Sequence, residues 1–324
     1  MVREPRGVVG VITPWNDPVA IACGLIGAAL VTGNTVVHKP SERTPHTGAR
    51  LVELLAEDLP PGVLTMIAGD RSAGAPLAAH PDLDLLAHVG STRAGREIAA
   101  TARCRVLREN GGKDPLIVDE GVDPKWAAGQ AALGAFANAG QICVSVERIY
   151  VHRSVAEPFT AALVIAAQAL RMGSGLDEAT TLGPLVDRRQ REIVHEHVRS
   201  AAAAGARVLT GGDIPDGPGA FYPATVLADC ADDMLVLREE TFGPVAAVRV
   251  VESFDEALAL ANTGEYGLAA TVLTLLAHVQ RAWRELRAGT VKVNAVFGGA
   301  PGGAAQPLGA SGRGSATAPS CSTR

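Results

Sequence analysis

The first third of the chain alternates short valine- and leucine-rich runs with stretches of helical periodicity. The runs at 7–13, 34–40, 62–68, 84–90 and 105–110 are strand candidates, and helical patterns at 19–32, 45–55, 72–80 and 92–103 separate them. Strands separated by helices of about 10–15 residues are typical of βαβ units in a parallel sheet, whose right-handed crossovers place helices on both faces. We therefore predict a Rossmann-like parallel sheet here.

A second α/β pattern starts after the motif GGKDP at 111–115. It predicts strands at 116–121 and 147–153, helices at 123–140, 155–171 and 187–204, and further strands in ARVLTGG, FYPATVL and GPVAAVRVV. The length of 324 residues suits about two domains. We expect a cofactor domain over 7–114 and an α/β catalytic domain over 115–299. Residues 300–324 are rich in Gly, Ala, Ser and Pro without periodicity, so they are predicted to be a disordered tail.

Composition excludes several classes of function. The net charge is −5 and no basic run is interleaved with aromatics, which argues against a nucleic-acid partner. The longest apolar stretch, 19–31, has 13 residues, whereas a membrane span needs about 20. The five cysteines are odd in number, far apart and without CxxC spacing, which favours reduced thiols in a cytoplasmic protein without a metal site. His195 and His197 lack metal spacing on a helix and are expected at the surface.

The stretch NAGQICVSVER at 138–148 contains Cys143. It follows a predicted helix and precedes a predicted strand, so Cys143 lies on a connection, where catalytic groups are common. A lone cysteine is usually a buried, inert thiol. A nucleophilic thiolate would need electropositive or dipolar surroundings and suitable partners elsewhere in the chain.

Two such partners follow predicted strands. Glu109, in LRENGGKDP, ends a strand just before two glycines, and Asn16, in TPWNDP, follows the first strand. In open α/β sheets, sites gather outside the carboxyl ends of the strands. A carboxylate at Glu109 would suit activation of a water, and the Asn16 amide would suit an oxyanion hole. The alternatives are a solvated loop carboxylate and an Asx turn.

Two further stretches suit a dinucleotide. HVGSTRAGR, with Gly90, joins a strand to a helix whose N-terminal N–H groups would suit a pyrophosphate, although it is not GxGxxG. Glu42 follows the second strand, where an acidic residue often holds the adenine ribose; it could instead be a carboxylate stabilised by a helix N-terminus. EETFGPV at 239–245 is, by itself, an ordinary loop.

Taken together and in order, these segments resemble the aldehyde dehydrogenase superfamily. The matching stretches extend from Gly7 to about Asn294 and are GVVGVITPWNDP, GNTVVHKPSERTP, DLPPGVLTMIAG, HVGSTRAGREIA, ENGGKDPLIV, GAFANAGQICVSVERIYV, LGPLVD, YPATVL, EETFGPV, EYGLAATV and GTVKVN. The resemblance implies an aldehyde dehydrogenase-like fold and the NAD(P)-dependent oxidation of a small aldehyde.

The resemblance also implies residue roles. Cys143 matches the nucleophile, Glu109 the general base and Asn16 the oxyanion donor. The matching cofactor-binding positions are Trp15, Lys39, Glu42, Gly90, Ser91, Glu240 and Phe242. The implied reaction passes through a thiohemiacetal and a thioester that water hydrolyses. Because members that pass the acyl group to coenzyme A generally lack this glutamate, Glu109 favours hydrolysis. Glu42 favours NAD over NADP, which stays possible.

Several departures from the family's pattern bear on activity. Family members extend further at the N-terminus, so residues 1–6 are expected to be a remnant of the oligomerisation arm, and the C-terminal end matches only loosely. The family forms homo-oligomers through arms that are mostly missing here, so an inactive remnant is one alternative. A CoA-acylating aldehyde dehydrogenase is a separate alternative. Asp17 and Asn110 replace residues usual beside the site and are expected to alter the substrate pocket or a pKa.

Overall fold

The computed structural model describes residues 4–297 and 306–313, and the chain divides into two compact units. The first contains Met1–Gly111 with the segment from Gly302, and the second contains Gly112–Pro301. Lys113 and Asp114, assigned from the sequence to the cofactor domain, therefore belong to the second unit. Their partners give the reason, because Lys113 Nζ lies 2.5 Å from Glu147 Oε2 and Asp114 Oδ1 accepts a hydrogen bond from Ala269 N (3.1 Å).

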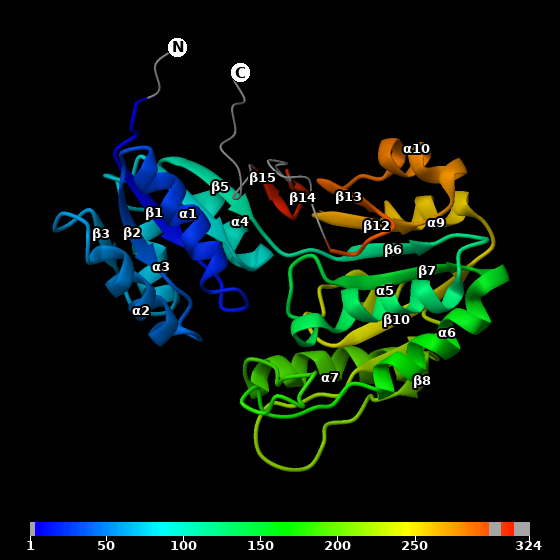
Figure 1. Ribbon diagram of the computed structural model, residues 1–324. Helices are drawn as coiled ribbons and strands as arrows, with labels where there is room; N and C mark the ends of the chain where they lie inside the picture. The colour runs from blue at the N-terminus through cyan, green and yellow to red at the C-terminus, as the bar shows by residue number, and fades with distance from the viewer. Residues whose placement is uncertain (1–3, 298–305, 314–324) are drawn as a thin grey trace. The chain divides into compact units, whose positions relative to one another are not determined.

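The first unit is built on one sheet in the order β15-β5-β4-β1-β2-β3 (Figure 1). Strands β1 to β5 are parallel, which confirms the predicted arrangement, and β15 is antiparallel to β5. The elements are β1 (Val8–Ile12), α1 (Ala20–Val31), β2 (Thr35–Lys39), α2 (Pro45–Ala56), β3 (Leu64–Met66), α3 (Arg71–Ala78), β4 (Leu85–Val89), α4 (Thr92–Thr101), β5 (Arg105–Glu109), β14 (Leu308–Gly309) and β15 (Gly312–Arg313).

Helices cover both faces of this sheet because successive strand residues point to opposite sides. Val9 and Val11 pack in one core with residues of α1 and α2, whereas Val8 and Ile12 pack in the other with residues of α3 and α4. Both faces are therefore apolar, as parallel sheets require. This explains why the strands read as nearly continuous apolar runs.

The prediction of a disordered tail is wrong for part of that segment. Residues 306–313 contain β14 and β15, while 300–305 and 314–324 lie outside the described residues. Gly312 pairs with Glu109, and a Cβ on Gly312 would lie 2.2 Å from Arg108 O, so only glycine fits. Asn110 holds the segment, since its N donates to Ser311 O and its Nδ2 to Ala310 O, each at 2.8 Å.

The second unit contains a seven-stranded sheet in the order β13-β12-β6-β7-β10-β9-β8, parallel except for β8. Its elements are β6 (Asp114–Val118), α5 (Pro124–Phe136), the 3₁₀ turn η1 (Ala137–Gly140), β7 (Val146–His152), α6 (Arg153–Gln168), α7 (Arg188–Ala203), β8 (Arg207–Thr210), β9 (Thr225–Ala228), α8 (Leu235–Arg238), β10 (Val245–Val251), α9 (Phe254–Ala261), β11 (Tyr266–Gly267), β12 (Ala269–Leu273), α10 (Leu276–Glu285) and β13 (Thr290–Val293).

This sheet also separates two cores. Ile149 and Val151 of β7 face the core that contains residues of α5, α6 and α7, and Tyr150 between them faces α9 and α10. Figure 1 shows α9 and α10 on the side of the sheet away from α5 and α6. The predicted α/β class is thus confirmed for both units. Within 4–297 and 306–313, no helix is long and apolar enough to cross a membrane.

Candidate active site

Cys143 lies on the connection between α5 and β7, as predicted, but the helix before it ends earlier than expected. It stops at Phe136, and Asn138, Ala139 and Gly140 then adopt left-handed φ values of 49°, 53° and 70°. Such a backbone persists only where surrounding contacts fix it. Gln141 supplies them, because its Nε2 donates to Asn138 O (3.0 Å) and its Oε1 accepts from Val186 N (2.8 Å).

Two other segments of the second unit pack directly against this connection. A Cβ on Gly140 would lie 2.0 Å from Gly243 O, and a Cβ on Gly112 would lie 2.7 Å from Cys143 O. Real Cβ atoms do not approach so closely, so both positions require glycine. The backbones around Gly112, Cys143 and Gly243 therefore interlock.

Glu240 and Phe242 lie in the segment that ends at Gly243. Glu240 Oε1 accepts a hydrogen bond from Gly112 N (2.9 Å), and Phe242 has a left-handed φ of 52°. Burial, reinforced by the nearby Glu147 carboxylate, raises the pKa of Glu240 to about 8. The structure thus brings three predicted site residues, Cys143, Glu240 and Phe242, together in one unit.

The site residues predicted in the first unit lie at the carboxyl ends of its strands. Lys39 ends β2, Glu109 ends β5, and Gly90 and Ser91 follow β4. The register aligns these ends, because Ile12 pairs with both Lys39 and His88, and Val89 pairs with Glu109. Asn16 follows β1 at the same edge. The prediction from strand order is therefore confirmed for the position of these residues.

Local contacts give these side chains different environments. Lys39 Nζ lies 3.5 Å from Glu42 Oε2; the lysine side chain is 6% exposed and that of Glu42 is 52% exposed. Ser91 is the N-cap of α4, with Oγ accepting from Ala94 N (3.3 Å). A helix N-terminus, a lysine and an exposed carboxylate at one edge of a sheet are chemically suited to phosphate and ribose groups.

Glu109 is a half-buried residue at the end of a strand that is paired on both sides, with β4 and β15. Its carbonyl accepts from Gly90 N (3.1 Å). Burial raises the pKa of its carboxyl group. A raised pKa suits a group that must accept a proton from water.

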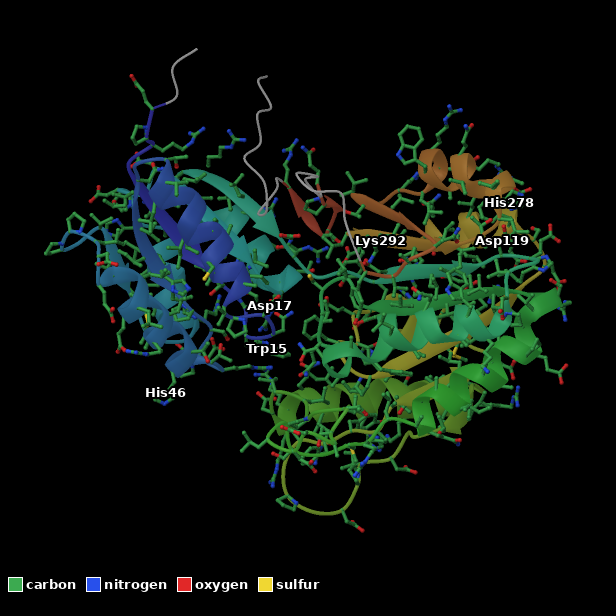
Figure 2. All side chains as sticks on the ribbon, in the orientation of Figure 1. Trp15, Asp17, His46, Asp119, His278 and Lys292 are labelled. Carbon is green, nitrogen blue, oxygen red and sulfur yellow. The ribbon has the colours of Figure 1, made fainter. Side chains whose placement is uncertain are left out.

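The turn after β1 contains Trp15, Asn16 and Asp17 (Figure 2). The guanidinium of Arg43 lies 5.4 Å from the centre of the Trp15 ring, a distance typical of a cation–π contact.

Asp17 is exposed, whereas Asn110 is buried and bonds to the 310–311 backbone. Asn110 therefore has a structural role in the first unit that the sequence did not predict.

Sequence reasoning missed a buried polar cluster in the second unit. Lys113, Glu147 and His197 are 2%, 4% and 6% exposed, so the prediction that His197 is a surface residue is wrong. His197 Nδ1 lies 3.1 Å from Thr241 Oγ1, and burial lowers the pKa of its ring. One signal was available, since Glu147 interrupts an apolar strand, and a charge in such a strand needs a buried partner.

A second titratable pair lies away from Cys143. Asp119 Oδ2 lies 2.6 Å from His278 Nδ1, at the opposite end of β6 from Gly112 (Figure 2).

In the part of the chain that the structure describes, no group of three or more His, Cys, Asp and Glu side chains could hold a metal ion. Among the described residues, no disulfide joins the four cysteines, Cys23, Cys104, Cys143 and Cys230.

Comparisons with known proteins agree with the resemblance. The model of the aldehyde dehydrogenase family matches residues 1–321. Betaine aldehyde dehydrogenase 1 of Rhizobium meliloti (strain 1021) is 42% identical over 300 residues, which are 90% of this chain and 62% of that protein. The chain thus spans less than two thirds of the length of this curated relative.

Solved structures give the same result. An NAD-dependent aldehyde dehydrogenase from Sinorhizobium meliloti superposes with a TM-score of 0.92 at 37% identity, covering 95% of this chain and 63% of that one. Betaine aldehyde dehydrogenase from Staphylococcus aureus, in complex with NAD+, superposes with a TM-score of 0.93 at 35% identity, covering 96% and 64%.

Proposed function

Because this chain belongs to the aldehyde dehydrogenase family, we propose that it oxidises a small aldehyde to a carboxylic acid through a covalent adduct on Cys143. The observation that carries the proposal is the interlocked backbone of the second unit. Glycines at 112 and 140 let the Cys143 connection lie against the segment of Glu240 and Phe242. A nucleophile placed beside cofactor-binding side chains is what a hydride-transfer enzyme needs.

Each step of the proposed reaction uses a named group. The Cys143 thiolate adds to the aldehyde carbon, and the Asn16 amide with Cys143 N–H donates hydrogen bonds to the oxyanion. NAD, when bound, accepts the hydride. The acyl group is left as a thioester on Cys143, and Glu109 takes a proton from the water that attacks it. The sulfur leaves as a thiolate, so the net change is aldehyde, NAD+ and water to acid, NADH and a proton.

The side chains present fit a dinucleotide. Lys39 and Glu42 would hold the adenine ribose, and Gly90 and Ser91 at the start of α4 would hold the pyrophosphate. Trp15 would contact the cofactor from the turn after β1, and Glu240 and Phe242 would hold the nicotinamide riboside. The half-exposed Glu42 carboxylate would repel a 2′-phosphate, which supports NAD over NADP.

An absorbance assay at the NADH band tests the function. Purified protein is given NAD with an aldehyde panel that includes betaine aldehyde, the substrate named for the curated relative, with and without coenzyme A. We expect NADH without coenzyme A, none from Cys143→Ala, and an unchanged rate from Cys23→Ala, a matched change of a half-buried thiol on α1.

The other outcomes separate the alternatives. NADH that forms only with coenzyme A would identify an acylating enzyme and remove the proposed role of Glu109. No NADH from folded protein with any aldehyde would overturn the proposal and leave an inactive member of the family.

A further inference from the structure

A buried ion pair lies beneath the segment that contains Glu240 and Phe242. Lys113 Nζ and Glu147 Oε2 are 2.5 Å apart, and the two side chains are only 2% and 5% exposed. Removing two charges from water costs free energy that their mutual attraction often fails to recover. A gain in stability therefore explains this ion pair poorly, and its contacts with other residues give it a second role.

Both oxygens of the Glu147 carboxylate accept hydrogen bonds from consecutive backbone amides. Oε2 accepts from Thr241 N and Oε1 from Phe242 N, each at 2.8 Å. Lys113 Nζ also donates to Thr241 Oγ1 (3.1 Å). The pair thus holds a neighbouring segment of irregular backbone, in addition to bridging the entry to β6 and strand β7.

The carbonyl groups of the same two residues are held from another side. Gln190 Nε2, on α7, donates to Thr241 O (3.2 Å) and Phe242 O (3.1 Å). Phe242 has a φ of 52°, a conformation that a residue with a side chain adopts at a cost. Side chains from β7 and α7 therefore fix both amides and both carbonyls of a strained dipeptide.

This dipeptide directly follows Glu240. Glu240 Oε1 accepts from Gly112 N, one residue before Lys113, so the contacts form a closed ring through Lys113, Glu147, Thr241, Glu240 and Gly112. A displacement of Thr241 would move Glu240 with it.

We propose that Glu147 is a positioning residue that fixes the 240–242 segment in the conformation that binds the nicotinamide riboside. The proposal rests on the proposed function for that consequence, but the positioning itself concerns only contacts within the second unit. Glu147 is buried and acts through the backbone of Thr241 and Phe242, which donate to its carboxylate.

The test compares Glu147→Gln with the wild type in two measurements. The first is amide hydrogen exchange of the peptide that covers 239–244, without ligand. Glutamine has one acceptor oxygen for two N–H donors, so we expect faster exchange there. The second is steady-state kinetics, where the KM for NAD should rise about tenfold or more, since hydrogen bonds to a charged group are lost, with a smaller change in kcat.

Two controls separate positioning from general destabilisation. Glu252→Gln makes the same change in an exposed ion pair with Arg153 and should leave both measurements unchanged. A double variant, Lys113→Met with Glu147→Met, removes both charges and should recover stability relative to Glu147→Gln, because a buried ion pair is often replaceable by apolar groups. Its 239–244 exchange should stay fast and its KM for NAD high.

The failing outcomes are distinct. Unchanged exchange and an unchanged KM for NAD in Glu147→Gln would overturn the inference while the enzyme proposal stands. Recovery of protection and NAD affinity in the double variant would also overturn it, because the pair would then be structural only. A wild type that neither binds NAD nor forms NADH would end the proposed function, and the exchange measurement would still decide whether Glu147 holds the segment.

Discussion

Burial shifts the pKa of different groups in the two units, although the second also contains His197, whose pKa burial lowers. In the first, burial lowers the pKa of His38 and of His88 to about 4. In the second, burial raises the pKa of Asp114 and of Glu240 to about 8. All four groups are thereby favoured in their neutral forms. The difference teaches that lowering the pH and raising it should weaken different groups of this molecule.

The direction in which stability changes with pH follows from proton binding in the folded and unfolded states. His88 binds a proton near pH 6.5 when unfolded but only near 4 when folded, so its stabilising contribution is present above 6.5 and lost as the pH falls through 4. Glu240 loses its proton near pH 4.5 when unfolded but near 8 when folded, so its contribution is present below 4.5 and lost as the pH rises through 8.

Glu109 breaks this contrast, since it is a half-buried carboxylate in the first unit whose pKa burial raises. Glu109→Gln should lower the steady-state rate about 10²- to 10⁴-fold by removing the general base. An initial burst of NADH should remain, with an acylated chain visible by intact-mass spectrometry. Glu53→Gln, an exposed change on α2, is the control. Equal steady-state rates for Glu109→Gln and wild type would remove Glu109 from the mechanism.

The interlocked backbone of the second unit can be broken at one glycine. Gly140→Ala should destabilise the protein by about 1–3 kcal/mol, because its φ is 70° and its Cβ would meet Gly243 O. Gly129→Ala, on α5 with open space around its Cβ, should instead stabilise by about 0.5–1 kcal/mol. Urea denaturation measures both. A Gly140→Ala midpoint at or above that of wild type would contradict the packing.

Glu240→Gln sharpens the contrast for the loss of stability as the pH rises. The variant cannot ionise, so the fall in stability between about pH 4.5 and 8 should become shallower. The urea midpoint measured across this range, with hydrogen exchange of second-unit peptides, gives the slope. Glu239→Gln, at an exposed neighbouring position, serves as the control. If the two variants keep the same slope as the wild type, Glu240 is ionised in the folded protein.

His88→Leu tests the acid side and has the smallest expected effect, because the shift in pKa is smaller than that of Glu240. The loss of stability between about pH 6.5 and 4 should become shallower in peptides of the first unit. His46→Leu changes an exposed histidine on α2 and should leave that slope unaltered. A slope that is the same in all three proteins would show that His88 titrates normally.

Several features of the fold and the site could be predicted from local pattern. The alternation of apolar runs with helical stretches predicted two α/β units. Asn16 was placed correctly after the first strand, and Glu109 at the end of the fifth. This worked because parallel strands end at a common edge, so their order along the chain is enough to bring residues such as Asn16 and Glu109 to that edge. The chemical roles of these residues stay predictions.

Other features depended on partners distant in the chain. Lys113 meets Glu147 and Thr241 across 34 and 128 residues, and Asn110 meets Ala310 across 200. No local periodicity encodes such contacts, so the burial of His197 and strand β15 were missed. The sequence by itself determined the strands and helices that have a local apolar pattern, such as β1 to β5 and β7. Only the tertiary structure decided which charges are buried and which backbone segments they hold, because burial is set by long-range packing.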